Sequence, residues 1–98
     1  MLKITYDPAK DVSNLAKHGL TLALAIELEW HTLKCKPDTR RDYGELRQIG
    51  YVIAGDRLYC VVFVDRPADV PTERRIISVR KTNNREILNY ASQVPDLK

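Results

Sequence analysis

The sequence contains no apolar run approaching the roughly 20 residues that a membrane-spanning helix requires. Residues 1–6 also lack the long apolar stretch of a secretory signal. Cysteine is scarce: Cys35 and Cys60 have neither Cys-x-x-Cys nor Cys/His ligand spacing, which favours reduced, buried thiols over a disulfide or a metal site. These absences predict a cytoplasmic protein with no membrane partner and no bound metal.

Several common catalytic motifs are absent too. The sequence holds no P-loop, no paired Cys/His zinc motif, no Ser-His-Asp order and no Gly-rich dinucleotide turn, so we expect no cofactor. What is present is a chain of 98 residues with 44% hydrophobic content. That length and composition fit one domain, residues 1–98, with a modest core.

Basic residues are concentrated in one stretch, although the net charge is only +3. Between positions 66 and 85, six basic residues accompany only two acidic ones, Asp69 and Glu73. Such a local excess of positive charge attracts a polyanion. A solvated basic surface explains a single cluster of this kind about equally well.

The first 30 residues predict a strand and two helices. Residues 3–6 alternate as a short strand, Asp7 suits a helix N-cap, and Pro8 suits the first helical position. Apolar residues then follow at helical spacing to Gly19, which fits a C-terminal cap. Residues 20–30 alternate like a strand, but their Ala and Glu content and the i,i+4 spacing of their leucines favour a second helix, which is our prediction.

The remaining two thirds predict an antiparallel sheet and a closing helix. Residues 31–35 form a short strand before a polar loop over 36–44, and residues 45–54 and 57–66 form a hairpin around a type II′ turn at Gly55-Asp56. The second hairpin strand is apolar on both faces and therefore central. A last strand, 74–81, puts Ile77 and Val79 on one face and Arg74, Ser78 and Arg80 on the other; Asn83 or Asn84 then caps a helix. This order is typical of an α+β fold.

Three groups of residues could carry chemistry. The first is Lys17-His18-Gly19, where a helix-end histidine acts as a base or merely complements the helix dipole. The second is residues 40–47, in which Glu45 and Arg47 converge if a strand begins at Glu45; an internal ion-pair network explains the same residues nearly as well. The third is the last strand, with Arg74 and Arg80 on one face and Arg75 and Lys81 on the other. Residues two apart along one face of a strand lie roughly 6 to 7 Å apart, close to the spacing of phosphates along a single nucleic-acid strand.

Metal-free RNA cleavage needs a base for the 2′-hydroxyl, cations for the phosphorane and an acid for the leaving oxygen. The residue types present leave alternatives open. Glu45 or His18 could be the base, Arg75 and Arg80 could stabilise charge, and the acid could be Tyr43, Tyr90 or His18.

Several segments, in order along the chain, resemble the BrnT toxins of type II toxin-antitoxin systems. The matching pieces are residues 6–10 (YDPAK), 14–20 (NLAKHGL), 41–47 (RDYGELR), 75–81 (RIISVRK), 85–86 (RE) and Tyr90. The resemblance covers nearly the whole chain. The sequence differs from the usual family pattern in three places. It has Tyr6 where the family often has Trp, residues 23–25 are less acidic than usual, and the segment 64–73 is longer and richer in proline.

The resemblance implies a RelE-like α+β fold of the RelE/ParE superfamily, with two N-terminal helices and a C-terminal helix packed on a mostly antiparallel sheet. It implies a metal-independent endoribonuclease that cleaves RNA and inhibits translation. It also implies that an antitoxin similar to BrnA neutralises the toxin in a hetero-oligomer, and the ribosome is a further candidate partner. Catalytic candidates on this basis are Arg75, Arg80, Glu45, His18 and Tyr90; RNA-binding candidates are Lys17, Arg41, Tyr43, Arg47, Arg74 and Lys81.

Two other functions fit the same residues. One is a non-catalytic module whose basic surface binds an antitoxin or a nucleic-acid backbone. The other is a toxin directed at gyrase, as in the ParE branch of the superfamily.

Overall fold

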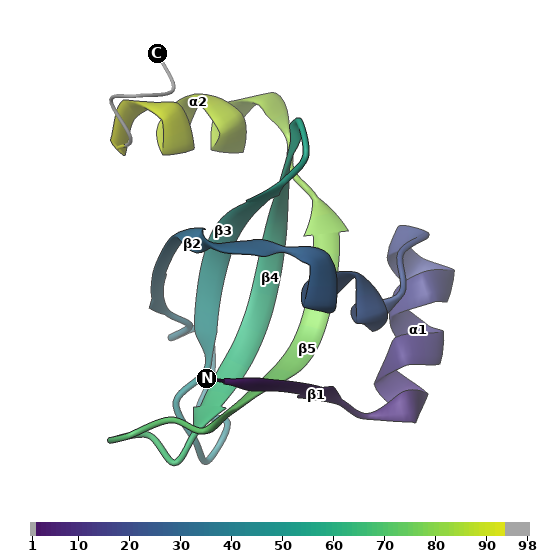
Figure 1. Cartoon of the computed structure of the whole chain (residues 1–98), viewed down its shortest axis with the longest axis vertical. Helices are drawn as coiled ribbons and strands as arrows, with labels where there is room; N and C mark the ends of the chain where they lie inside the picture. The colour runs from purple at the N-terminus through teal and green to yellow at the C-terminus, as the bar shows by residue number, and fades with distance from the viewer. Residues whose placement is uncertain (1, 94–98) are drawn as a thin grey trace.

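The computed structural model describes residues 2–93. Its elements are β1 (Lys3–Tyr6), α1 (Pro8–His18), the 3₁₀ helix η1 (Leu22–Glu27), β2 (Glu29–Pro37), β3 (Gln48–Ala54), β4 (Arg57–Arg66), β5 (Glu73–Lys81) and α2 (Asn84–Gln93). The strands form one sheet in the order β1-β5-β4-β3-β2, in which only the β1–β5 pair is parallel (Figure 1). None of the described helices is both long and apolar enough to cross a membrane. The predicted α+β class is confirmed.

The first strand and helix form as predicted. Asp7 is the N-cap of α1, its carboxylate accepts a hydrogen bond from the Ala9 backbone N–H at 2.8 Å, and Pro8 follows at the first helical position. Gly19 ends the helix with φ 73°, a left-handed conformation that glycine adopts without strain. A side-chain contact of Asp7 and a backbone contact of Gly19, both local, set these two ends, which is why the sequence predicts them.

The predicted second helix over 20–30 is wrong in kind and length. The chain makes only the short 3₁₀ helix η1, and β2 begins at Glu29. Residues three apart align on a 3₁₀ helix, so Leu22, Ala25 and Leu28 are the buried set. The Asp11 carboxylate accepts a hydrogen bond from the Leu22 N–H at 2.7 Å and so fixes the start of η1 against α1.

The β3–β4 hairpin has the predicted turn and register. Ala54 pairs with Arg57 around Gly55-Asp56, and Tyr51 lies opposite Cys60. β4 is the middle strand, as predicted. The first strand of the hairpin is shorter than predicted, because β3 begins at Gln48 rather than Glu45.

A β-bulge in β5 overturns the predicted facing of this strand. Val62 pairs with Ser78 but Phe63 pairs with Ile76, so Ile77 is an extra residue that shifts the side-chain alternation. Ile76 and Val79 are therefore both buried in the core, and Ile77 is not. Arg75 and Arg80, rather than Arg74 and Arg80, share the other face.

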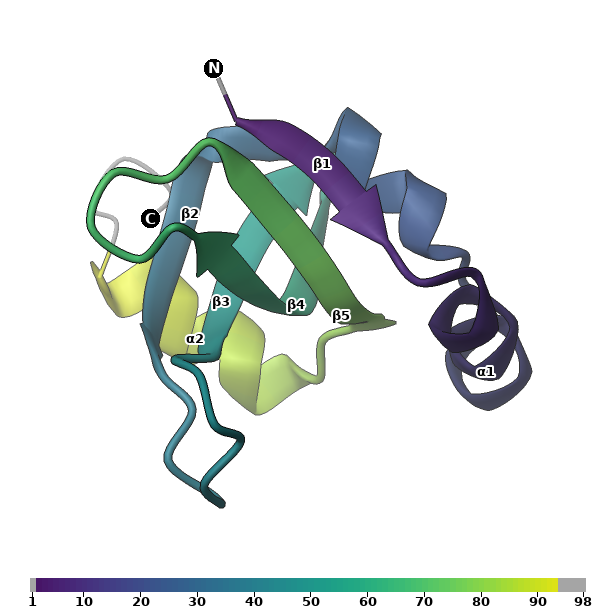
Figure 2. The same cartoon turned by 90° about the horizontal axis from the view of Figure 1, so that it is seen from below.

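The two faces of the sheet differ in what covers them. The core face, which carries Val52, Val61, Phe63, Ile76 and Val79, packs against η1 and the start of β2. The open face carries Ile49, Cys60, Val62, Ser78 and Arg80. Figures 1 and 2 show α1 beside the β5 edge and α2 across the end of the sheet at the β3–β4 turn.

The last helix is capped as predicted. Asn83 and Glu86 form a reciprocal capping box: the Glu86 N–H donates to the Asn83 side chain at 2.9 Å and the Asn83 N–H donates to the Glu86 carboxylate at 3.0 Å. Ile87 and Leu88 are exposed, and Tyr90 is the buried residue of α2. Cys60 is buried as predicted, whereas Cys35 is exposed.

Candidate active site

A basic groove of about 400 Å³ lies on the open face between α1 and β5, and we name it the α1–β5 groove. Its floor comes from the sheet, through Ile49, Cys60, Val62, Ile77 and Ser78. Its walls carry Ser13, Asn14 and five groups that are cationic or titratable: Lys10, Lys17, His18, Arg40 and Arg80. The bulge in β5 contributes to this floor, because it turns Ile77 and Ser78 toward the same side.

Asn14 fixes α1 to the sheet at this groove. Its buried side-chain amide donates to the Val79 carbonyl at 2.8 Å and to the Leu20 carbonyl at 2.9 Å, and its oxygen accepts from the Val79 N–H at 3.1 Å. Asn14 therefore takes the place of a neighbouring strand at the edge of β5. Since Lys17 and His18 follow on the same helix, this contact sets them beside Arg80.

His18 lies half-buried at the end of α1. Partial burial, followed by the positive charges of Lys17 and Arg80, lowers the pKa of its imidazole below 6.5. The imidazole is therefore neutral at pH 7 and able to accept a proton. A neutral base surrounded by cations is suited to deprotonating a hydroxyl next to a phosphate.

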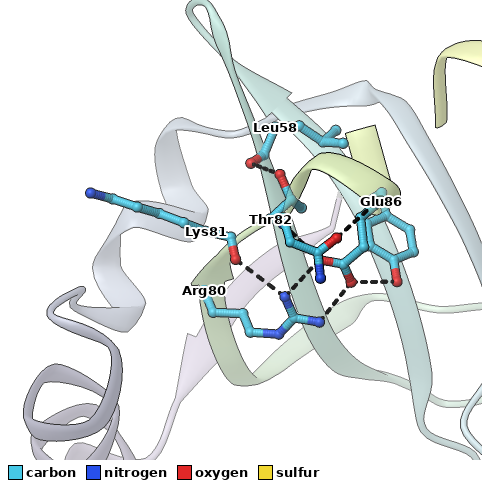
Figure 3. A network of polar contacts seen from close by, with 7 residues as sticks. Leu58, Arg80, Lys81, Thr82 and Glu86 are labelled. Carbon is cyan, nitrogen blue, oxygen red and sulfur yellow. Dashed lines mark hydrogen bonds and ion pairs between the residues drawn. The ribbon is translucent and has the colours of Figure 1, made fainter. Parts of the chain in front are cut away.

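Arg80 is held by a polar network at the junction of β5 and α2 (Figure 3). Its Nη1 and Nη2 donate to the two oxygens of Glu86 at 2.9 and 2.8 Å, and Nη1 also donates to the Lys81 carbonyl at 3.2 Å. Tyr51 donates its hydroxyl to the same carboxylate at 3.0 Å. These donors, Arg80 first, hold the pKa of Glu86 down at about 2, and burial followed by the Glu86 contact raises the pKa of Tyr51 to about 12.

The network leaves one edge of the Arg80 guanidinium without a partner among residues 2–93. A guanidinium has five N–H donors. The Glu86 carboxylate accepts one N–H of each terminal nitrogen, Nη1 and Nη2, and the Lys81 carbonyl accepts the other N–H of Nη1. The Nε–H and the second Nη2–H remain, and these two are parallel and match two oxygens of a phosphate.

Comparison with known proteins identifies the family. A family model described as "Ribonuclease toxin, BrnT, of type II toxin-antitoxin system" matches residues 6–86. The chain belongs to the BrnT family. It is thus a ribonuclease toxin of a type II toxin-antitoxin system.

A solved structure supports the same fold for this BrnT-family chain. The Brucella abortus ribonuclease toxin BrnT, determined by crystallography, is similar with a TM-score of 0.63 and 24% sequence identity. The match covers 86% of this chain and 100% of that one. No curated protein matches in sequence.

The predicted site residues of this BrnT-family chain divide between the groove and other places. Lys17, His18 and Arg80 meet in the α1–β5 groove. Arg75 is half-buried on the open face and forms no ion pair with the described residues. Lys81 points away from Arg80, as Figure 3 shows.

Arg74 forms an ion pair with Asp65 on the core face. Its Nε and Nη2 donate to the Asp65 carboxylate at 2.8 and 2.9 Å, and its guanidinium stacks 4.5 Å from the Phe63 ring centroid and 4.7 Å from that of Trp30. Only 13% of its side chain is exposed. Two of its five donors are thus used within the fold, and most of the side chain is covered.

Glu45 and its neighbours lie outside the groove. Glu45 accepts two hydrogen bonds from Arg66, at 3.1 and 2.7 Å, and these bonds lower the pKa of its carboxyl. The strand expected to start at Glu45 begins at Gln48, so Glu45 and Arg47 both precede β3. The Arg47 guanidinium stacks 4.0 Å from the Tyr43 ring centroid. Arg41 is exposed in the same loop.

Tyr90 is the buried residue of α2, and its hydroxyl donates to the Thr32 carbonyl at 2.5 Å. This bond ties α2 to β2. Tyr90 is not among the described residues that line the α1–β5 groove.

Three groove-associated residues had no role assigned from the sequence, although Arg40 belongs to the candidate group 40–47. Asn14 and Glu86 lie within the family-like segments, but their roles depend on contacts 65 and 6 residues away along the chain. Arg40 reaches the groove because Asp38, whose side chain is fully buried, holds its backbone and guanidinium. A buried Asn or Asp leaves no mark in composition, so only a structure identifies them. Among residues 2–93 no group of three or more His, Cys, Asp or Glu side chains is arranged to hold a metal.

Proposed function

We propose that this chain is a metal-independent endoribonuclease whose active centre is the α1–β5 groove. One observation carries the proposal: His18 lines the same groove as Arg80, whose guanidinium keeps one edge without a partner among residues 2–93. A base and an anion-binding group in one groove are two of the three groups that metal-free RNA cleavage requires, and the third is an acid for the leaving oxygen.

The proposed reaction proceeds through the 2′-oxygen of the RNA. His18 accepts the proton of the 2′-hydroxyl, and the 2′-oxygen attacks the adjacent phosphorus. The Nε–H and Nη2–H of Arg80 bind the two non-bridging oxygens, whose charge grows in the phosphorane, and Lys17 adds positive charge. The P–O5′ bond then breaks, the 5′-oxygen takes a proton from water in the open groove, and His18 gives its proton to the hydroxide that remains. The products are a 2′,3′-cyclic phosphate and a 5′-hydroxyl.

Of the other predicted catalytic residues, Arg75 remains the strongest candidate for a second phosphate contact. It shares the open face with Arg80 and has no ion-pair partner among residues 2–93. Glu45 and Tyr90 are poorer candidates, because Arg66 and the Thr32 carbonyl occupy them. The groove residue Arg40 also adds positive charge.

The cellular consequences belong to the same proposal. Cleavage of cellular RNA would inhibit translation in the cytoplasm, with or without the ribosome as a platform, and an antitoxin similar to BrnA would neutralise the chain in a hetero-oligomer. We also propose that residues 1–98 act as a single domain, which the one hydrophobic cluster in residues 2–93 supports.

Product analysis tests the chemistry. The purified chain should cut a defined RNA in EDTA and leave 2′,3′-cyclic phosphate ends, and a 2′-deoxy residue at the cleaved position should block the cut there. Cleavage of that 2′-deoxy substrate, or activity that requires an added divalent ion, would contradict the mechanism. RNA binding with no cleavage would favour the non-catalytic alternative.

A further inference from the structure

A second hollow, of about 190 Å³, adjoins the α1–β5 groove on the open face. It lies between the β2–β3 edge of the sheet and α2, and we name it the lysine hollow. Its lining residues are Lys34, Cys35, Lys36, Ile49, Tyr51, Asn89, Tyr90 and Gln93. Ile49 lines both hollows, so they meet at this side chain.

Strand register places two lysines on the same face as Arg80. Lys34 pairs with Tyr51 and Lys36 pairs with Ile49, and paired residues project to the same side of a sheet. Tyr51 in turn pairs with Cys60, and Cys60 with Arg80. Cys35, between the lysines, faces the core side, where its Cβ lies opposite Gly50.

Both lysines are available to a ligand. Each is exposed, and neither forms an ion pair with the residues that the structure describes. On the α2 wall of the hollow, Asn89 and Gln93 contribute side-chain amides, which can donate to and accept from the sugar and base of a nucleotide. The hollow therefore combines positive charge with neutral hydrogen-bonding groups.

We propose that Lys34 and Lys36 form a second phosphate-binding subsite for the RNA strand that is cut at Arg80. This inference rests on the proposed function. β5 and β2 are separated by three strand spacings of about 4.8 Å, or roughly 14 Å. At roughly 6 to 7 Å per phosphate, a strand held at Arg80 reaches the lysines with about its second neighbouring phosphate. The subsite thus binds the nucleotides on one side of the cut.

The test compares long and short RNA substrates. After the cleaved bond has been mapped, a short RNA with one nucleotide on either side of it is compared with RNAs extended by six nucleotides on the 5′ side or on the 3′ side. The double variant Lys34→Ala/Lys36→Ala should raise KM about tenfold for one of the extended RNAs and leave kcat/KM for the short RNA unchanged. The matched control, Lys3→Ala/Arg57→Ala, also removes two exposed positive charges, but outside both hollows, and should change neither.

Binding measurements keep this inference separate from the proposed reaction. With the extended RNA carrying a 2′-deoxy residue at the mapped bond, the slope of log affinity against log salt should fall by about 0.7 per lysine, or about 1.4 for the pair. If the parent chain cuts no RNA, the proposed function fails, and the same salt slope measured on an unmodified RNA still decides the subsite. An equal loss for short and long RNA, no change in slope, or the same change in the control pair would overturn the subsite.

Discussion

Replacing Glu86 by Gln tests whether the polar network at β5 and α2 serves the reaction or only the fold. Gln keeps the shape of the side chain and one accepting oxygen. Its amide N–H groups, however, face a guanidinium that has only donors, so at least one of the bonds at 2.8 and 2.9 Å is lost. Arg80 is then free to leave the orientation in which its open edge meets a phosphate.

The size of the effect follows from the exposure of the pair. A hydrogen bond to a charged group contributes about 1.5 to 3 kcal/mol. We take the lower value, because 37% of the Arg80 side chain and 14% of the Glu86 side chain are exposed and solvent weakens the pair. A loss of about 1.5 kcal/mol in the transition state lowers kcat about tenfold. A similar loss of stability lowers Tm by about 6 to 12 °C for a chain of this size.

The direction of the change in KM distinguishes a role of the network in the reaction from a role in the fold alone. Glu86→Gln removes a negative charge close to the groove, so KM for RNA should stay constant or fall while kcat falls. Asn83→Ala is the control, because it removes the cap bond to the Glu86 N–H and leaves the Arg80 contacts in place. A folded Glu86→Gln enzyme with the parent kcat, or an equal fall in kcat for Asn83→Ala, would refute the positioning role.

Four further predictions address the pH dependence and the fold. Because the pKa of His18 lies below 6.5, single-turnover cleavage should be constant near pH 7 and fall as pH decreases through that lowered pKa; a rate that instead rises on acidification would show that the imidazole is not the base. Because the pKa of Glu86 is lowered to about 2 from 4.5, its contribution to stability should be complete above pH 4.5 and lost between pH 4.5 and 2, so acid titration of Glu86→Gln should lack that part of the parent's loss. Asn14→Ala removes three hydrogen bonds and leaves the Val79 backbone groups without partners, so chemical denaturation should show a loss of about 3 to 5 kcal/mol; a loss under 1 kcal/mol would mean that α1 is held by other contacts. Ile76→Ala should lower the free energy of unfolding by about 2 to 5 kcal/mol and Ile77→Ala by clearly less, since of the two only Ile76 is fully buried. The reverse order would show that the bulge in β5 is not at Ile77.

Features fixed by short-range contacts were predictable from sequence. The Asp7 cap, the Gly19 cap and the Gly55-Asp56 turn each depend on a few neighbouring residues, and each occurs where predicted. The central place of β4 followed from apolar residues on both of its faces. In these places a local preference and the final fold agree.

Features fixed by pairing between strands were not predictable. The bulge at Ile77 arises because β5 must match β4 on both sides of it, and strict alternation assigned Ile76 and Arg74 to the wrong face. Likewise, residues 20–30 alternate like a strand and carry leucines at helical i,i+4 spacing, but neither pattern predicts the structure. The buried residues of this segment are three positions apart, as in a 3₁₀ helix.

The candidate site was predicted in part for the same reasons. Lys17, His18 and Arg80 stood out by residue type and by resemblance to the family. Their meeting depends on Asn14, a buried polar residue whose partner on β5 is distant in sequence. Glu86 had no predicted role, because the sequence does not reveal that its carboxylate would meet Arg80.

The most direct test of the account is the single-turnover cleavage rate of His18→Ala and Arg80→Ala on one defined RNA, with Arg57→Ala as a control outside the groove. Loss of the base should slow cleavage by about 10² to 10⁴, and loss of the phosphate-binding fork by about 10² to 10³, while Arg57→Ala cleaves at the parent rate. Folded His18→Ala and Arg80→Ala proteins that cleave as fast as the parent would contradict the assignment of the active centre to the α1–β5 groove.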